Sequence, residues 1–218
     1  MKNALRFIAP LLDLAILIMV VIAMVMMLTG ANGILSEGGI GFLKYFTVQS
    51  NLLMGIAALC SLPFDILLLA KKSNQHPLAI KILNFAGSIG VTLTFIVVMV
   101  WLGPAYGYSA MFAGANLFFH LIVPIASIIR IIFLEAKYKE LKIKHTFFGI
   151  IHLAIYGVFY LINIAVNNGY GDINYDWYNF GRGGLPFGLL AFTLIIVATY
   201  GICVGIYFAQ RAINKLKD

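Results

Sequence analysis

Charged side chains are scarce in this sequence. The 15 Lys and Arg and the 8 Asp and Glu residues make up 11% of its 218 residues, whereas 62% are hydrophobic. Because a soluble domain carries roughly 25% charged residues, this chain lacks the polar surface that a protein needs in order to face water. The composition therefore excludes a soluble catalytic domain, a nucleic-acid-binding domain and a disordered regulator.

Cysteine and histidine are also rare. Cys60 and Cys203 each lie inside an apolar run, which argues against a disulfide or a zinc cluster. Of the four histidines, two fall in or beside loops that we expect on the cytoplasmic side. The other two, His120 and His152, lie roughly 12 Å apart along the expected membrane normal and are poorly placed to share one metal. The sequence implies no metal and no other cofactor.

Long apolar runs are the main feature of the chain. A transmembrane helix needs about 20 apolar residues, and breaker sequences rich in Gly, Asn and Pro separate six such runs. The runs are Ile8–Gly30, Phe46–Ala70, Ile82–Leu102, Met111–Leu134, Thr146–Val166 and Leu185–Ala209. The first has no small-residue cleavage site after a short apolar core, so we interpret it as a retained helix. We expect an all-α polytopic membrane protein with six transmembrane helices, forming one domain over residues 1–218.

Basic residues are divided unequally between the two sides of these six runs. Arg130 lies inside the fourth run, and only Lys44 and Arg182 fall on one side. The twelve on the other side are Lys2, Arg6, Lys71, Lys72, Lys81, Lys137, Lys139, Lys142, Lys144, Arg211, Lys215 and Lys217. By the positive-inside rule, both termini are expected in the cytoplasm, and in a bacterium the chain would lie in the inner (plasma) membrane.

Polar residues inside the runs are expensive in hydrocarbon and therefore face protein or a wet cavity. At helical spacing, polar residues gather on one face of the second, the fourth and the fifth run. The faces are Thr47, Ser50 and Asn51; Asn116, His120 and Ser127; and His152, Tyr156 and Asn163. We expect hydrogen bonds across helices from Ser88, Thr92, Ser127 and Asn163. We expect His152 to occupy a packed position in the core. We expect Asp13 and Asp65 to pair with basic residues or to cap a helix.

Thr47 and His120 together form the pattern of a nucleophile and its base. A hydroxyl is a weak nucleophile unless an adjacent base accepts its proton, and an imidazole is the usual base. Asn116 lies one turn from His120 and could orient the ring, while an oxyanion needs nearby donors. The candidate donors are Gln49, Ser50 and Asn51. The pair can meet only if the second and fourth helices bring both residues to one depth, which spacing permits but does not require.

The second helix opens with the run Phe46-Thr-Val-Gln-Ser-Asn51, and the fourth contains His120 and Pro124. This pattern resembles the androgen-induced gene and androgen-dependent TFPI-regulating protein family, especially its bacterial six-helix relatives. Asp176-Trp177-Tyr178 in the last external loop is also similar, although Asn179 to Gly184 replaces a Pro-rich continuation. The resemblance implies an intramembrane threonine hydrolase that cleaves fatty acid esters of hydroxy fatty acids. It implies that Thr47 and His120 are catalytic, and it makes Asp176 and Trp177 candidates for supporting or substrate-binding residues.

Two other functions are compatible with the sequence. Six helices with an aromatic external loop at residues 167–184 also suit the substrate-binding subunit of a membrane transporter without catalytic activity. The aromatic side chains of that loop either anchor helices at the membrane interface or form a lid over an outward-facing site. A metal or haem enzyme is the other alternative. For the hydrolase, the expected partners are membrane lipids and a lipid ester substrate, and no nucleic acid.

Overall fold

The computed structural model describes residues 2–30, 39–73, 75–134 and 141–215. Over these residues the chain is helical without a β-strand, and six stretches are long and apolar enough to cross a membrane. The stretches are Phe7–Thr29, Phe46–Leu69, Leu78–Tyr106, Ala115–Leu134, Ile143–Val166 and Leu185–Ile213. The predicted all-α fold with six apolar spans is thus confirmed, with ends shifted by at most four residues. Of the expected cytoplasmic cations, Lys137, Lys139 and Lys217 lie outside the described residues.

Five of the spans contain one long helix each, and the fourth is assembled from short pieces. The long helices are α1 (Lys2–Thr29), α2 (Phe46–Leu69), α3 (Leu78–Val97), α8 (Phe148–Val166) and α9 (Leu185–Lys215). The fourth span consists of α6 (Ala115–Leu117), η3 (Phe118–Ile122), α7 (Val123–Ile129) and η4 (Arg130–Leu134). The third span continues from α3 through η2 (Val98–Leu102) and α4 (Gly103–Tyr106), and the fifth begins with η5 (Ile143–Phe147). Between spans lie η1 (Gly41–Lys44) and α5 (Tyr108–Met111).

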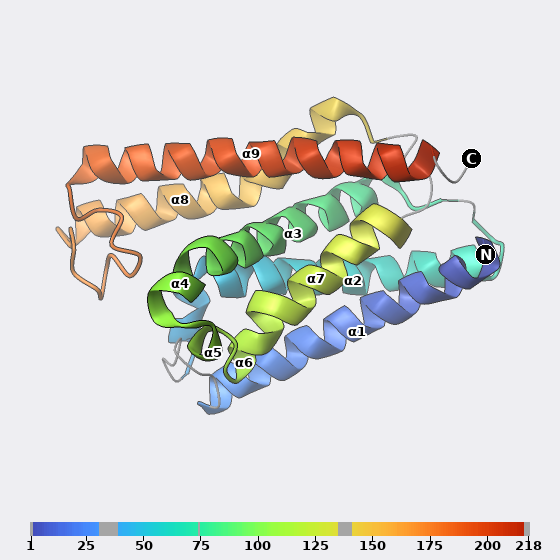
Figure 1. The fold of residues 1–218 in the computed structure, drawn as a ribbon, viewed down its shortest axis with the longest axis horizontal. Helices are drawn as coiled ribbons and strands as arrows, with labels where there is room; N and C mark the ends of the chain where they lie inside the picture. The colour runs from blue at the N-terminus through green and yellow to red at the C-terminus, as the bar shows by residue number, and fades with distance from the viewer. Residues whose placement is uncertain (1, 31–38, 74, 135–140, 216–218) are drawn as a thin grey trace.

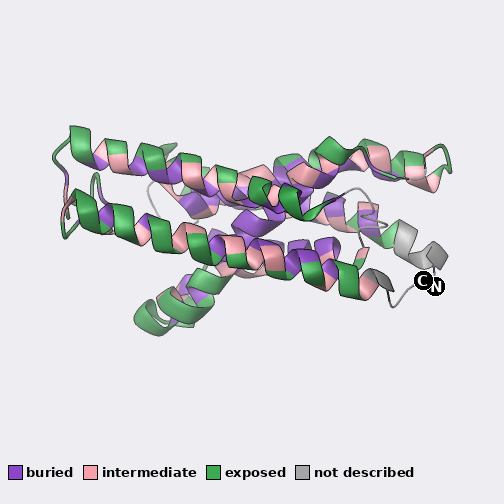
Figure 2. Cartoon of the chain, turned by 90° about the horizontal axis from the view of Figure 1, so that it is seen from above, coloured by how far each residue is buried: buried purple, intermediate pink, exposed green. Residues whose placement is uncertain are grey.

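The long helices lie side by side, with α7 crossing obliquely in front of α2 and α3 (Figure 1). The start of α1 and the end of α9 lie at the same end of the bundle, as an even number of spans requires (Figures 1 and 2). Figure 2 shows exposed residues along the outer faces and buried residues facing inward. Large apolar side chains such as Val100, Phe159 and Val197 are more than 60% exposed. Such a surface is suited to lipid, where apolar contact costs nothing.

Two prolines explain the wide, π-helical turns η2 of the third span and η3 of the fourth. Pro104 and Pro124 have no N–H group, and a proline ring collides with the carbonyl four residues earlier. The chain widens just before each of them, so that Gly103 N–H donates to the Val98 carbonyl and Val123 N–H to the Phe118 carbonyl. Turns of this kind are often found at functional sites. The one before Pro124 contains His120.

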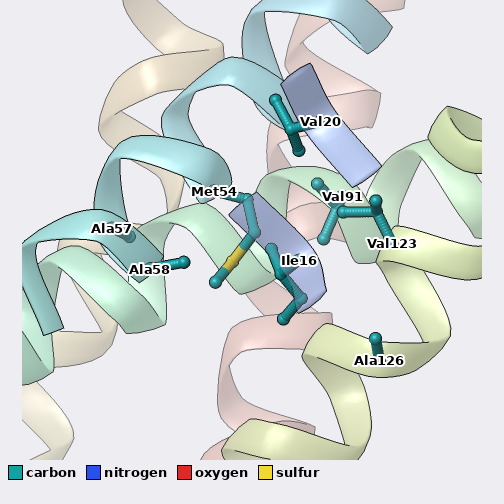
Figure 3. Packing of buried hydrophobic residues seen from close by; sticks show 8 residues of the cluster. All are labelled: Ile16, Val20, Met54, Ala57, Ala58, Val91, Val123 and Ala126. Atoms are coloured by element: carbon teal, nitrogen blue, oxygen red, sulfur yellow. The ribbon is translucent and has the colours of Figure 1, made fainter. Parts of the chain in front are cut away.

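Four spans meet around Met54 in the centre of the bundle (Figure 3). This apolar cluster is built from α1, α2, α3 and α7, and consists of Ile16, Val20, Met54, Ala57, Ala58, Val91, Val123 and Ala126. Small residues let the backbones approach closely. A Cβ at Gly87 of α3 would stand 3.0 Å from the Cα of Met54, so an alanine there would require the backbones of α2 and α3 to move apart by a few tenths of an ångström.

Buried charges tie α1, α2 and the fourth span together at the end of α2. The guanidinium of Arg130 donates to both carboxylate oxygens of Asp13 at 2.8 Å, and lies 3.9 Å from Asp65. The imidazole of His76 lies 2.9 Å from the other oxygen of Asp65. All four side chains are at least 94% buried. The expectation that Asp13 and Asp65 pair with basic residues is confirmed, with His76 as a further partner.

Hydroxyl and amide side chains elsewhere in the bundle follow the expected pattern in part. Ser127 donates to Ser88 at 2.7 Å and so links α7 to α3, as predicted. Asn163 of α8 donates to the carbonyl of Tyr175 in the loop that follows α8. Thr92 differs, because its hydroxyl donates to the Ser88 carbonyl of its own helix at 2.6 Å. A threonine can satisfy its hydroxyl one turn back without a neighbouring helix.

Candidate functional site

His120 lies inside the bundle with one ring nitrogen engaged and the other without a partner. Its side chain is 2% exposed, and Nδ1 lies 2.7 Å from the backbone carbonyl of Met111. Because a carbonyl can only accept, Nδ1 carries the proton of the neutral ring. Nε2 is then a bare acceptor, and it is buried with no hydrogen-bond partner among the described residues, Thr47 included. This is the state that a general base needs before substrate arrives.

Thr47 lies in the first turn of α2, half-buried, at the same level of the bundle as His120. The link is the Asn51 amide, whose nitrogen donates to the Thr47 carbonyl at 2.8 Å and to the Phe119 carbonyl at 3.1 Å. One amide nitrogen therefore contacts the backbone of Thr47 and the residue preceding His120. The backbone carbonyls of Thr47 and Phe119 therefore lie on either side of one amide group, at a similar depth in the bundle.

The three donors proposed for an oxyanion are already engaged. Gln49 Nε2 donates to the Leu43 carbonyl at 2.9 Å, and Asn51 Nδ2 makes the two bonds just described. Ser50 donates to the Thr47 carbonyl at 3.0 Å and lies 3.2 Å from the hydroxyl of Thr94. Their hydrogen bonds hold the first turns of α2 to η1 and α3. In this structure they therefore position Thr47 rather than point at an empty space.

Asn116 is fully buried, and neither of its amide atoms has a hydrogen-bond partner among the described residues. The Met111 carbonyl makes the contact to Nδ1 of His120 that the sequence suggested for Asn116. A backbone carbonyl carries no residue-type signal, so sequence reasoning missed it. The Oδ1 atom of Asn51 is also buried and unpartnered.

Buried polar atoms without partners are rare in proteins, because each costs about 1–3 kcal/mol. Here three neighbouring residues contribute such atoms: Asn51, Asn116 and His120. Asn116 and His120 are one turn apart, and Asn51 contacts the residue before His120. A water molecule or a polar group of a ligand would satisfy them. The arrangement offers a base, an amide donor and a threonine within one level of the bundle.

Asp176 organises the aromatic loop at residues 167–184. One carboxylate oxygen accepts from the hydroxyl of Tyr160, and the other accepts from the N–H groups of Gly171 and Gly181 at 3.0 and 2.9 Å. The side chain is 1% exposed. Its oxygens are thus occupied by the protein, and Asp176 holds the loop against α8 rather than facing a substrate.

Tyr178 connects this loop to the start of α2. Its hydroxyl accepts from the N–H of Phe46 at 2.9 Å, and so satisfies one of the free donors at the helix N-terminus. Burial raises the pKa of Tyr178 to about 12. The phenol therefore stays protonated at neutral pH, and the loop is fixed over the helix that carries Thr47.

A groove of about 400 Å³ opens between α2, α8 and the loop at residues 167–184. His152, Tyr156 and Asn163, which the sequence places on one face of the fifth span, all line it, together with Trp177 of the loop. Trp177 Nε1 donates to the hydroxyl of Tyr156 at 3.0 Å, and that hydroxyl donates to the Lys44 carbonyl at 2.8 Å. His152 is therefore a groove residue, half-buried and stacked on Phe46, and not a fully enclosed core residue.

No protein-family model, curated protein or solved structure matches the chain. Among the described residues, no three His, Cys, Asp or Glu side chains lie close enough to hold a metal ion. Any reading of function therefore depends on the residues themselves and on the arrangement around His120.

Proposed function

We propose that this protein is an intramembrane hydrolase that cleaves a lipid ester, with Thr47 as nucleophile and His120 as general base. The observation that carries the proposal is the buried, unpartnered Nε2 of His120, on a ring fixed by the Met111 carbonyl. A buried acceptor without a hydrogen bond lowers the stability of the fold, and a role as the proton acceptor in catalysis explains its presence. The resemblance of Phe46 to Asn51 to the androgen-induced gene and androgen-dependent TFPI-regulating protein family supports the same pair and a fatty acid ester substrate.

The reaction proceeds in two halves. In the first, the Thr47 hydroxyl attacks the ester carbonyl carbon while its proton moves to Nε2 of His120. His120 then gives that proton to the departing alkoxide, which leaves as an alcohol, and an acyl-threonine remains. In the second half, water attacks the acyl carbon and gives a proton to Nε2. The threonine oxygen takes that proton back as the fatty acid leaves, so the site returns to its starting state.

Asn116 supplies the oxyanion donor in this scheme. Its amide nitrogen is buried without a partner, whereas the nitrogens of Gln49 and Asn51 already donate to carbonyls. A donor that is fixed in an apolar surrounding stabilises developing negative charge strongly, because little water competes with it. Substrate contact through Trp177 is compatible with its place at the groove.

The membrane orientation forms part of the proposal. Twelve of the fifteen basic residues fall on one side of the helices, which puts both termini in the cytoplasm. Thr47 opens the second span and the aromatic loop closes the fifth, so the site faces the outer leaflet. A lipid ester would then enter sideways from that leaflet, in the inner membrane if the source is bacterial.

Substitution of Thr47 provides the test. Thr47→Val keeps the β-branched shape and removes only the hydroxyl, so the helix should persist while ester cleavage is abolished. Thr47→Ser should keep partial activity. Thr199→Val is the matched control, because Thr199 is a buried threonine of α9 whose hydroxyl donates within its own helix. A fluorophosphonate should label the parent and the control on the peptide containing Thr47, but not Thr47→Val.

Two outcomes would reject the hydrolase. One is a Thr47→Val protein that cleaves lipid esters at the parent rate. The other is a parent protein that cleaves no lipid ester and is not labelled, in which case the transporter-subunit alternative becomes the better explanation. Tight, stoichiometric ligand binding and co-purification with an ATPase would then be the measurements to make.

A further inference from the structure

The proline of the third span leaves one backbone carbonyl without its helical donor. In the widened turn η2, the Gly103 N–H donates to the Val98 carbonyl, five residues earlier. The next residue, Pro104, has no N–H to give to the Met99 carbonyl. A bare carbonyl in a membrane span is costly, so another donor is expected to reach it. The hydroxyl of Tyr108 donates to this carbonyl at 2.8 Å.

The fourth span shows the same arrangement. There Pro124 has no N–H for the Phe119 carbonyl, and the amide of Asn51 donates to that carbonyl at 3.1 Å. The same amide nitrogen donates to the Thr47 carbonyl at 2.8 Å. In both spans a side chain from elsewhere replaces the donor that a proline lacks. In the fourth span, this side chain also holds a residue of the candidate site.

Tyr108 begins the one-turn helix whose last residue contacts His120. This helix is α5, and it ends at Met111. The Phe112 N–H donates to the Tyr108 carbonyl at 2.9 Å, and the rings of Tyr108 and Phe112 stack with 6.0 Å between their centres. The Met111 carbonyl lies 2.7 Å from Nδ1 of His120. Tyr108 and the carbonyl that fixes the His120 ring therefore belong to one hydrogen-bonded turn, which lies between α4 and α6 (Figure 1).

Glycines join this turn to the rest of the chain. Gly107 precedes it with φ +87°, and Gly114 follows it with φ +55°, conformations that a residue with a side chain rarely adopts. Because glycine restricts the backbone little, the contacts of the turn's own side chains decide where it sits. A third glycine, Gly103, makes room for Tyr108, since a Cβ there would collide with Cε1 of the ring. The tyrosine thus lies directly against the backbone of the third span.

We propose that Tyr108 is a positioning residue for His120 and acts through the Met111 carbonyl. The inference rests on the proposed hydrolase, in which Nε2 of His120 has to be the bare nitrogen. A neutral imidazole carries its proton on either nitrogen, and the hydrogen bonds of the ring decide which. With α5 held against the third span, the Met111 carbonyl keeps the proton on Nδ1. Without that anchor, part of the population carries the proton on Nε2, which then cannot accept the proton of Thr47.

Nitrogen NMR of isotope-labelled histidine provides the test. At mildly alkaline pH in detergent, the chemical shifts of Nδ1 and Nε2 distinguish the two neutral tautomers, and a His120→Gln sample assigns the His120 signals. The parent should show one tautomer, protonated at Nδ1. Tyr108→Phe removes only the hydroxyl and should add the signals of the second tautomer. Gly103→Ala keeps the hydroxyl but displaces the ring, and should have the same effect.

Tyr106→Phe is the matched control. It removes the same hydroxyl from the neighbouring turn α4, where Tyr106 is 66% exposed, and should leave the His120 signals as they are in the parent. In an ester-cleavage assay, Tyr108→Phe should lower kcat roughly fivefold with little change in KM, as expected when one hydrogen bond that positions the base is lost. A purely structural role would lower the thermal midpoint and leave the tautomer unchanged.

The spectra and the assay separate the two ways of failing. His120 signals in Tyr108→Phe that equal those of the parent, or an equal change in Tyr106→Phe, would overturn the role of Tyr108. A parent protein that cleaves no lipid ester would reject the hydrolase instead, because the tautomer is measured without any substrate. Thermal midpoints close to that of the parent show that the variants are folded.

Discussion

Replacing Arg130 by methionine tests whether buried charges hold one end of the helix bundle together. The guanidinium makes two 2.8 Å hydrogen bonds to Asp13 and lies 3.9 Å from Asp65. Methionine has a similar length and fills the same space, so packing changes little. What changes is that two buried carboxylates lose their shared counter-charge.

The expected cost follows from the burial of these groups. Removing one partner of a buried ion pair costs about 3–5 kcal/mol, because an uncompensated charge remains. Replacing both partners by apolar residues is often nearly neutral. Asp13→Leu combined with Arg130→Met should therefore recover most of the loss, since Asp65 keeps His76 at 2.9 Å. The double variant should be more stable than Arg130→Met alone.

Thermal unfolding in detergent provides the assay. Cys203 is fully buried, so a thiol-reactive fluorogenic dye reports unfolding when Cys60→Ala leaves Cys203 as the sole thiol. For a chain of this size, 1 kcal/mol corresponds to roughly 2–4 °C, so Arg130→Met should lower the midpoint by roughly 6–20 °C. A midpoint equal to that of the parent would refute the reasoning. So would a double variant whose loss equals the sum of the two single losses.

Two further predictions concern topology and packing. In a cysteine-free background, a membrane-impermeant thiol reagent added to intact cells should label Ile173→Cys but not Lys142→Cys; labelling of the second would reverse the orientation. Gly149→Ala should destabilise the fold by about 1–3 kcal/mol, because the added Cβ would stand 2.5 Å from Cys203 Sγ. Gly205→Ala is its control, since no atom lies within 4 Å of the added Cβ and alanine favours the helix. Equal thermal midpoints for the two glycine variants would contradict the packing argument.

The candidate site was only partly predictable. Thr47 and His120 could be selected from the sequence because burying a hydroxyl and an imidazole in hydrocarbon costs free energy, which favours a functional role. The protonation state of the His120 ring could not be predicted, because Nδ1 donates to the Met111 backbone carbonyl and every residue type has such a carbonyl. The roles of the supporting residues also changed: Asp176 proved to hold the loop, and the donors on α2 proved to be engaged by the protein.

The sequence by itself determined the class of fold. A helix satisfies its own backbone groups, so runs of about 20 apolar residues specify spans without reference to the rest of the chain. Tertiary structure alone decided which polar groups meet. Asn51 reaches the Phe119 carbonyl, Arg130 joins α1 to the fourth span, and Lys44 comes to lie beside Trp177. These contacts join residues up to 133 positions apart, and they depend on helix tilt, rotation and depth, which hydropathy does not encode.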